Sequence, residues 1–498
     1  MRPTKTRSDF RLDQQPSART ISSKLEHEIK LIVGPEFRLP RLSGIPLPRR
    51  LLVSTYYDTV SHDLTHARIT LRQRVEKGKQ VWQLKIPLGH EREEIELTSR
   101  DAHPPLSFRE LLLIHLDHRK LMPITTLRVW RSGVRIHQGR IPVADVLLDN
   151  VAVVKYDEVI QRFREVEIEQ LDGHSAVLDE LEQALRKAGA RDHDGRPKLF
   201  RALSLPAPTS NQPPESNAPV IDHLKWALTQ HVRWLTAHDP GTRLGLQAES
   251  LHQMRVATRR LRAVLRSAQA ILVSAWAVSL ERELAWLSDT LSQARDLDVQ
   301  IAYFNGEASQ VGVRDRKPLA RFVAHLNVER KRVQHMVLSE LKSARYLELL
   351  RRLQQAAQDP SALETAVTLR ELARQDFKKL QKAIRCMGTS PKPAQLHQIR
   401  IKTKRARYAA ELARWSVGKP ALRFIKRARM VQDLLGTYQD SFTTELYIRA
   451  FLKQSSGVRA GFVAGRMTER QRQRRQAVLG QITPLLKSLL KRGRRAWG

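Results

Sequence analysis

The feature that most constrains the fold is a proline-rich segment dividing the chain into two parts with different hydrophobic periodicities. Residues 203–220 read LSLPAPTSNQPPESNAPV, with five prolines among Ser and Asn, and such a composition favours a linker over a packed element. Before it, short runs alternate apolar and polar side chains, as strands do. After it, apolar residues recur three and four positions apart, as in amphipathic helices. The sequence therefore predicts an α+β multidomain fold, with an antiparallel β tunnel or barrel followed by an all-α helical bundle.

The boundaries of the parts follow from this segment. We expect a basic disordered arm at 1–23, a β domain at 24–203, a linker at 204–220 and a helical domain at 221–498. Strands are expected at 25–33, 70–75, 81–86, 93–98, 126–131, 146–155 and 163–170, with one helix at 175–188. Helices of the second part are expected at 221–238, 249–270, 273–293, 316–338, 345–358, 361–386, 394–416, 419–437 and 443–453.

Charge is concentrated in the helical part. The formal net charge is +36, and 221–498 alone holds 52 Lys+Arg against 22 Asp+Glu, a net of +30 that leaves +6 for the rest. An excess of this size implies an anionic partner such as nucleic acid, an anionic membrane or polyphosphate.

The remaining composition narrows the class of protein. Cys386 is the only cysteine, which excludes an intramolecular disulfide and a Cys-rich metal site. The sequence has no run of 18 apolar residues, so no transmembrane segment is expected. The polar, basic N-terminus lacks the apolar core of a signal peptide. We therefore expect a cytoplasmic protein.

The helical part contains an internal repeat. LHQMRVATRRLRAVLR begins at Leu251 and LHQIRIKTKRARYAAE at Leu396, an offset of 145 residues, which predicts duplicated units over about 221–345 and 365–498. Each copy places a basic stripe on one helix face. The stripes comprise His252, Arg255, Arg259, Arg262 and Arg266, then His397, Arg400, Lys404 and Arg407, widened by Arg260, Lys402, Arg405 and Arg414. The stripe is either a solvated face or, because like charges at this spacing repel, a groove that an anion occupies.

Charged side chains also share strand faces in the β part. Glu26, Glu28 and Lys30 have one parity, as do Arg72 with Arg74, so each set lies on one face of its strand. The same holds for Arg92, Glu94 and Glu96, and for Glu165, Glu167 and Glu169. One such face would ordinarily be solvated. Their recurrence favours a barrel interior lined with both signs of charge, which is costly unless it holds ions.

These residues resemble the CYTH superfamily, the triphosphate tunnel metalloenzymes. EHEIK at 26–30 matches the ExExK signature, followed in order by YYDT at 56–59, LRQR at 71–74, QLKIP at 83–87, TLRVWR at 126–131, LLD at 147–149, REVEIEQLDG at 164–173 and PKLFRAL at 197–203. One departure is Arg68, near a position where family members often have glycine.

The resemblance implies hydrolysis of a triphosphate with Mg²⁺ or Mn²⁺ in the tunnel. By position, the metal ligands would be Glu26, Glu28, Glu94, Asp149, Glu167 and Glu169. The phosphates would be held by Lys30, Arg72, Arg74, Lys85, Arg92, Arg128 and Lys198. Catalysis would rest on Glu26, Glu28, Lys30, Glu167 and Glu169. The attacking group would be water, activated by a carboxylate or by a metal.

The helical part resembles a CHAD domain over about 216–498, on the repeated His-x-x-Arg pattern and on ARDLDV and YQDS downstream of it. The resemblance implies binding of inorganic polyphosphate by the nine stripe residues from His252 to Arg407. Further candidates are Arg330, Lys331, Arg332, Arg423, Lys426 and Arg427. A metal site at the two histidines is disfavoured, because they lack nearby ligand partners.

Several functions remain open at this level. The first is a metal-dependent triphosphatase coupled to polyphosphate binding. The second is a non-catalytic protein that binds polyphosphate or targets its granules, and the third is adenylate cyclase or thiamine triphosphatase activity in the tunnel. Nucleic acid is a disfavoured partner, because no nucleic-acid motif is present and aromatic residues make up only 6% of the chain.

Overall fold

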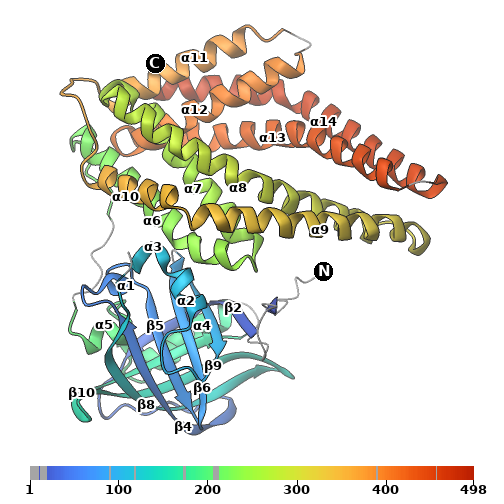
Figure 1. Ribbon diagram of the computed structural model, residues 1–498. Helices are drawn as coiled ribbons and strands as arrows, with labels where there is room; N and C mark the ends of the chain where they lie inside the picture. Colours follow the sequence, from blue (N-terminus) through green and yellow to red (C-terminus); the bar gives the residue numbers. More distant parts are fainter. Residues whose placement is uncertain are drawn as a thin grey trace. The chain divides into compact units, whose positions relative to one another are not determined.

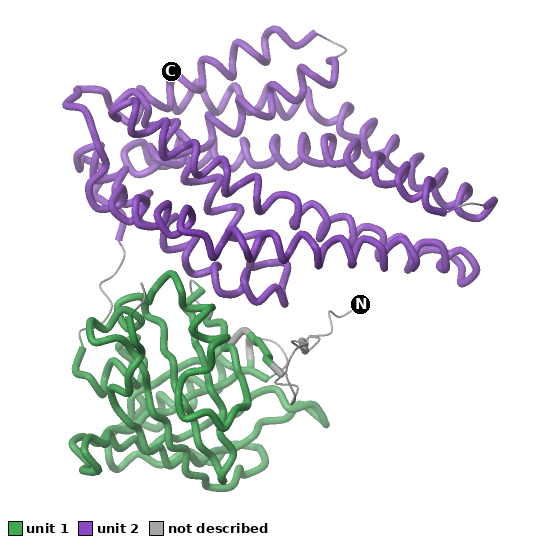
Figure 2. The backbone as a smooth tube through the Cα atoms, in the orientation of Figure 1, with its two compact units in different colours: residues 1–211 green, residues 212–498 purple. Residues whose placement is uncertain are grey.

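The chain folds into two compact units, residues 1–211 and 212–498 (Figure 2). The computed structural model describes residues 10–11, 20–88, 91–116, 119–171, 175–205, 212–388, 391–455 and 457–498. None of the helices in these ranges is long and apolar enough to cross a membrane.

The first unit is built on one antiparallel sheet (Figure 1). Its strands are β1 (Phe10–Arg11), β2 (Thr20–Glu26), β3 (Glu28–Ile32), β4 (Gly44–Asp58), β5 (Thr70–Glu76), β6 (Lys79–Leu88), β7 (Glu91–Thr98), β8 (Met122–Gln138), β9 (Ile141–Lys155), β10 (Glu158–Gln170) and β11 (Arg191–Asp192). Their order across the sheet is β1-β2-β7-β6-β5-β4-β8-β9-β10-β3-β11. An N-terminal antiparallel sheet of the predicted class is therefore confirmed.

The sheet curls so that its two ends meet. Only His27 separates β2 from β3, yet β2 pairs with β7 and β3 pairs with β10, near opposite ends of the strand order. The single strand expected at 25–33 is therefore wrong, because the chain crosses between sheet ends at His27. This crossing brings the ExExK segment to the seam of a tunnel.

Two other details differ from expectation. Part of the arm expected to be disordered at 1–23 belongs to the sheet, because β1 pairs with β2, β2 begins at Thr20, and Ile21 is buried opposite Leu97. Residues 1–9 and 12–19 lie outside the described part. β4 was not expected, since its first half contains Pro46 and Pro48, which obscure the alternation of a strand.

Two helices define the inside and outside of the sheet. Leu181 and Leu185 of α4 (Ser175–Lys187) pack on Val146 and Ile168, so this apolar face of β9 and β10 points outward. The opposite parity of β10, which carries the three glutamates, must face inward. Leu199 of α5 (Lys198–Ala202) packs among inward apolar residues of β4, β8 and β9. The other helices of this unit are α1 (Asp63–His66), α2 (Leu106–Leu111) and α3 (Leu113–Leu116).

The second unit is a helical bundle, as predicted (Figure 1). Its α-helices are α6 (Val220–Leu244), α7 (Ala248–Ser267), α8 (Ser274–Ser309), α9 (Val313–Leu341), α10 (Ala344–Gln358), α11 (Leu369–Arg385), α12 (Pro393–Val417), α13 (Lys419–Gln454) and α14 (Val458–Trp497). Helices α8 and α13 both have 36 residues, and their first residues are 145 positions apart. The first residues of α9 and α14 are also 145 positions apart. The repeat is therefore α6–α9 followed by α11–α14.

The helix assignments need two corrections. The helices expected at 419–437 and 443–453 form one continuous helix, α13. Helix α14 was not expected at all, because arginine, glutamine and glycine dilute its apolar periodicity. In its last turn Trp497 is 1% exposed and packs edge-on against Phe424, which anchors the C-terminal end of the helix in the core.

Candidate functional site

A charged cavity of about 180 Å³ occupies the interior of the curled sheet. Nine basic and five acidic side chains line it, with few apolar ones. It brings together residues from strands far apart in sequence, as the shared parities predict. Ten predicted site residues line it: Glu28, Lys30, Arg72, Arg74, Lys85, Arg92, Glu94, Glu167, Glu169 and Lys198.

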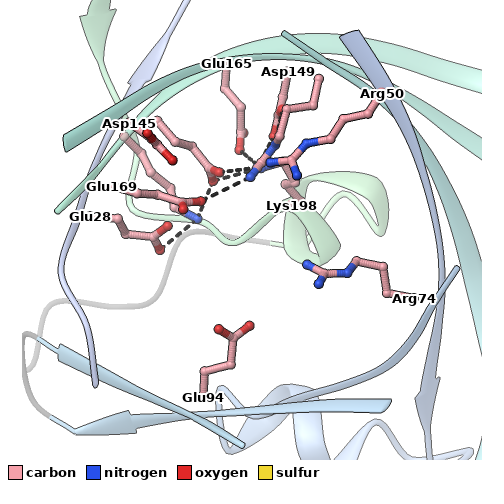
Figure 3. Close-up of polar contacts among 12 residues, drawn as sticks. Glu28, Arg50, Arg74, Glu94, Asp145, Asp149, Glu165, Glu169 and Lys198 are labelled. Atoms are coloured by element: carbon pink, nitrogen blue, oxygen red, sulfur yellow. Dashed lines mark hydrogen bonds and ion pairs between the residues drawn. The ribbon is translucent and has the colours of Figure 1, made fainter. Parts of the chain in front are cut away.

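One wall of the cavity is a cluster of buried carboxylates. Oxygens of Asp149, Glu165 and Glu167 lie within 4.8 Å of one another, and all three residues are buried. The Nζ of Lys198, at the start of α5, lies 2.9, 2.7 and 2.8 Å from these carboxylates, respectively. Figure 3 shows Glu28 and Glu169 on the same side of the interior. The wall is thus a dense anionic cluster that tolerates burial because cations bind it.

Arg131 is the second cation of this wall. It donates two hydrogen bonds to Asp149, at 2.7 and 2.6 Å, one to Glu167 at 2.6 Å and one to Glu169 at 3.1 Å. Four such bonds fix the guanidinium, and they orient the three carboxylates in turn. Lys30 adds contacts of 3.0 Å to Glu28 and 2.9 Å to Glu167.

The cations keep the carboxylates ionised despite burial. Burial alone would raise the pKa of Glu167, but the charges of Lys198, Lys30 and Arg131 outweigh it and hold that pKa well below its usual value. The pKa of Glu165 is lowered to about 2 because Lys198, 2.7 Å away, and the nearby His193 likewise outweigh the effect of burial. Glu165 and Glu167 are therefore ionised at neutral pH.

The opposite wall is mainly basic. Figure 3 shows Arg74 and Glu94 across the open interior from the carboxylate cluster. Glu94 lies 3.3 Å from Lys85 and 2.8 Å from Lys24. Arg72 donates to Gln83 at 2.8 Å and to the Tyr56 hydroxyl at 3.1 Å. Glu94 therefore does not join the other predicted metal ligands, because β7 lies on the far side of the tunnel.

Arg128 is not in the cavity, contrary to expectation. It is 46% exposed and lies 4.0 Å from Asp157. The side chains of β8 that point into the tunnel are Leu127 and Val129, which pack beside α5, and Arg131. Arg128 has the opposite parity and so points outward. The expectation that a charged residue faces inward failed here because this stretch of the interior is apolar.

Two other predicted residues need a comment, and six polar cavity residues were missed. Asp149 is fully buried behind Arg131. The side chain of Glu26 lies outside the described part, although its backbone pairs with Arg92 at the end of β2. The polar lining residues that were not predicted are Lys24, Arg50, Tyr56, Thr70, Glu76 and Arg131. Strand alternation from Leu127 to Arg131 is the signal that could have found the last of these.

The carboxylate cluster could bind a metal ion. Mg²⁺ and Mn²⁺ prefer carboxylate oxygens, and among the described residues Asp149, Glu165 and Glu167 form the one group whose ligand atoms lie close enough for an ion. Glu28 and Glu169 face the same cavity. This donor set therefore fits the hard divalent cation that the CYTH resemblance implies. At the two histidines, His252 and His397, no such group is formed by described residues.

The second unit has a basic groove between α7 and α12, the two stripe helices, which contact each other. A cavity of about 520 Å³ lies there. Its basic residues from the two stripes include Arg259, Arg262 and Arg266 on one side and Lys404 and Arg405 on the other. The Nε atoms of Arg259 and Arg400 are buried and make no hydrogen bond to any described residue. We call these facing stripes the α7/α12 groove.

The charges in the α7/α12 groove are mutually repulsive. Burial and the nearby Arg400, Arg259, Arg255 and Arg407 lower the pKa of Lys404 to about 7. Burial also lowers the pKa of Arg255 and Arg400. The charges of Asp296 and Asp440, one from each repeat, favour the ionised form of Arg255, and Asp440 and Tyr408 favour that of Arg400.

Other stripe residues are neutralised or lie at the margin. Glu281 takes a hydrogen bond of 2.6 Å from Arg266 and lies 4.0 Å from Arg262. Arg407 lies 3.7 Å from Glu411 and stacks on Tyr408. His397 is exposed, whereas burial and neighbouring arginines lower the pKa of His252. Of the further candidates, Arg330 is bound by Asp298 and Arg332 by Glu329, both at 2.6 Å.

Comparisons with known proteins agree with this division. A CYTH domain model matches residues 24–194 and a CHAD domain model matches residues 227–449. An uncharacterized protein of Mycobacterium tuberculosis, Rv2226, is 27% identical over 490 residues, covering 90% of this chain and 92% of that protein.

Two solved structures each resemble one unit. The CHAD domain from the plant Ricinus communis covers 57% of this chain and 96% of its own, at 24% identity and a TM-score of 0.46. The PH1819 protein from Pyrococcus horikoshii covers 36% and 96%, at 21% identity and a TM-score of 0.25. Together with the two domain matches, the curled sheet and the duplicated bundle identify the chain as a two-domain CYTH–CHAD protein.

Proposed function

We propose that the tunnel hydrolyses inorganic triphosphate, or a related triphosphate, with Mg²⁺ or Mn²⁺, and that the α7/α12 groove binds inorganic polyphosphate. The observation that carries the first part is the asymmetry of the tunnel. Its lining holds nine basic and five acidic side chains. Three of these acids, Glu28, Glu167 and Glu169, lie on one wall together with the buried Asp149 and Glu165. An excess of cations facing a carboxylate cluster suits a phosphate chain held against a divalent ion.

In this mechanism the basic wall positions the substrate. Arg72, Arg74, Lys85 and Arg92 would hold the phosphate oxygens and neutralise the charge that spreads over them as the anhydride bond breaks. Glu28, Glu167 and Glu169, backed by Asp149 and Glu165, would hold the cation, which supplies electrostatic stabilisation to the phosphoryl group. Lys30, Arg131 and Lys198 contact these carboxylates and orient them. Water attacks the terminal phosphorus, so that triphosphate yields phosphate and diphosphate.

Phosphate release tests the hydrolytic part. Inorganic triphosphate, ATP and thiamine triphosphate are each incubated with the full chain and Mg²⁺ or Mn²⁺, alongside Glu28→Ala. We expect release that requires the metal and is lost in Glu28→Ala, because Glu28 faces the cavity 3.0 Å from Lys30. No release from any compound would leave a non-catalytic polyphosphate-binding or granule-targeting protein. A clear preference for thiamine triphosphate would make that compound the substrate in place of inorganic triphosphate. Formation of cyclic AMP from ATP would instead indicate adenylate cyclase activity.

Polyphosphate binding is proposed for the groove because its cations lack sufficient counter-charge. CHAD is a polyphosphate-associated domain. The buried guanidinium atoms of Arg259 and Arg400, and the depressed pKa of Lys404, indicate that an anion would relieve an existing repulsion. A linear polyphosphate carries one charge per phosphate along a flexible chain, which matches two facing rows of bases.

Lys404 should make polyphosphate binding depend on pH. With a pKa of about 7 in the free protein, its side chain is charged below pH 7 and largely neutral above pH 8. A bound polyanion favours the charged form, so binding at pH 8 must take up a proton. The affinity should therefore fall as pH rises from 7 to 9, by up to about tenfold per pH unit. Calorimetry in buffers of different ionisation enthalpy measures both the affinity and the proton uptake.

Lys404→Arg provides the control for this pH dependence. Arginine stays charged throughout the range, so the variant should lack the part of the pH dependence and of the proton uptake that belongs to Lys404. The terminal phosphates of the ligand titrate in both proteins and cancel in the comparison. If wild type and variant show the same pH profile, Lys404 is not the titrating group.

A further inference from the structure

A second chamber adjoins the tunnel cavity. It measures about 360 Å³ and shares Arg74 and Glu76 of β5 with the tunnel lining. The turn between β5 and β6 borders it, with Lys77 and Gly78 at φ of 47° and 75°. Beyond Arg74, the inward positions toward the turn are Glu76 on β5 and Val81 and Lys79 on β6, and Lys77 lies in the turn itself. The chamber is lined by Ser22, Arg74, Glu76, Lys77, Lys79, Val81, Glu96 and Thr98.

The charges of this chamber suit phosphate. Its two acids are already engaged: Glu76 lies 3.3 Å from Arg50, and Glu96 lies 3.8 Å from Arg74 and accepts a hydrogen bond from Gln83. Lys77 and Lys79 form no ion pair with any described residue and are exposed. Their ammonium groups are therefore available to an anion that leaves the tunnel past Arg74.

The same lining does not suit a nucleoside. A protein ordinarily holds a nucleobase by stacking it on an aromatic side chain, worth about 1–3 kcal/mol per base. The described lining of this chamber contains no aromatic residue, and Val81 is its only apolar one. A fourth phosphate would find cations here, whereas an adenosine would find no stacking surface.

We propose that this chamber is a second phosphate subsite, which makes linear inorganic polyphosphates of four or more phosphates better tunnel substrates than nucleoside triphosphates. The inference rests on the proposed hydrolytic function. The central cavity holds the reacting phosphates, and the chamber binds the next ones through Lys77 and Lys79. These two lysines are then specificity-determining residues that do not touch the reacting phosphorus.

Hydrolysis kinetics with chains of different length test this subsite. For the full chain with Mg²⁺, we expect a lower KM for tetrapolyphosphate than for tripolyphosphate, and the highest KM for ATP. The double variant Lys77→Asn/Lys79→Gln removes both charges, and asparagine tolerates the positive φ at 77. It should raise the KM for tetrapolyphosphate about fivefold, as expected for two exposed charge pairs, and change that for tripolyphosphate less than twofold.

The matched control is Lys120→Gln/Lys187→Gln, which removes two exposed charges of the same unit outside both cavities. This variant should change neither the KM for tetrapolyphosphate nor that for tripolyphosphate. Equal increases for both chain lengths, or ATP preferred over tetrapolyphosphate, would overturn the inference. If no compound is hydrolysed, the proposed function fails. The subsite is then tested by calorimetry, which measures the affinity for each polyphosphate in an Arg255→Ala/Arg400→Ala background, where groove binding is weakened. A fivefold loss of affinity confined to tetrapolyphosphate supports the subsite, and equal affinities for both chain lengths reject it.

Discussion

Glu167→Gln is expected to lower the rate of phosphate release from inorganic triphosphate by on the order of 100-fold or more, with Mg²⁺ or Mn²⁺. Glu167 is 3% exposed and contacts Lys30, Lys198 and Arg131 at 2.9, 2.8 and 2.6 Å. Glutamine keeps the shape but removes the charge, so the cluster loses both a cation ligand and the counter-charge for three bases. Initial rates across a metal titration measure the effect.

The fold should survive this change, because each base keeps another acidic partner. Lys30 retains Glu28, and Lys198 retains Asp149 and Glu165. Circular dichroism and thermal unfolding check this point. Breaking one buried pair costs about 3–5 kcal/mol when no partner remains, and we expect less here. A variant that is folded, binds metal and keeps full activity would contradict the assigned role of Glu167.

Glu93→Gln is the matched control for Glu167→Gln. Glu93 is 1% exposed on β7, accepts a hydrogen bond from Ser23 at 2.8 Å and does not line the cavity. Burial raises its pKa, the opposite of Glu167, so a neutral side chain is tolerated there. Removing this carboxylate should leave phosphate release within about twofold of wild type, since surrounding contacts change little. Equal losses in both variants would point to general damage.

The contrast between these two glutamates shows what sequence can and cannot predict. Parity alone places Glu165, Glu167 and Glu169 on one face of β10, and α4 covers the other face with Leu181 and Leu185. The apolar outer face could be expected from the sequence. Which cation binds which acid could not, because Lys198 arrives from a helix far along the chain and Arg131 from β8.

The position of Arg128 shows where a family pattern misleads. The resemblance places Arg128 among the phosphate-binding residues, but its neighbours Leu127 and Val129 pack beside Leu199 of α5 in the interior, so Arg128 points outward. A similar limit applies to β2 and β3. The residues from Leu25 to Val33 alternate like one strand, and only the pairing of β2 with β7 and of β3 with β10 reveals the crossing at His27. Both errors arise from tertiary contacts that a local pattern does not encode.

The helical unit was predictable for a different reason. Its duplication is visible as two similar stripes, and the structure places them on α7 and α12, which contact each other. The electrostatic consequence was less predictable. Glu281 neutralises Arg262 and Arg266 from α8, whereas Lys404 lies among arginines of both stripes. The unneutralised part of the groove is therefore centred on Arg255, Arg259, Arg400 and Lys404.

Arg255→Ala/Arg400→Ala is expected to weaken polyphosphate binding by on the order of 100-fold. These residues are equivalent positions of the two repeats. Each charge-assisted hydrogen bond to a phosphate contributes about 1.5–3 kcal/mol, so two should reach this size. Fewer ionic contacts should also make the affinity less sensitive to salt, as for other polyanions. Titration of the full chain at several salt concentrations measures both quantities.

Arg351→Ala/Arg472→Ala carries the same loss of charge without touching the groove. Both arginines are mostly exposed and pair with glutamates three residues earlier on α10 and α14. If binding depended only on net charge, the two double variants would lose affinity equally, and the groove assignment would be wrong. If the groove holds the ligand, the control should stay within about threefold of wild type, because exposed ion pairs contribute little. Competition by DNA at matched salt completes the test: a groove shaped for polyphosphate should retain its ligand, whereas a general polyanion surface should release it.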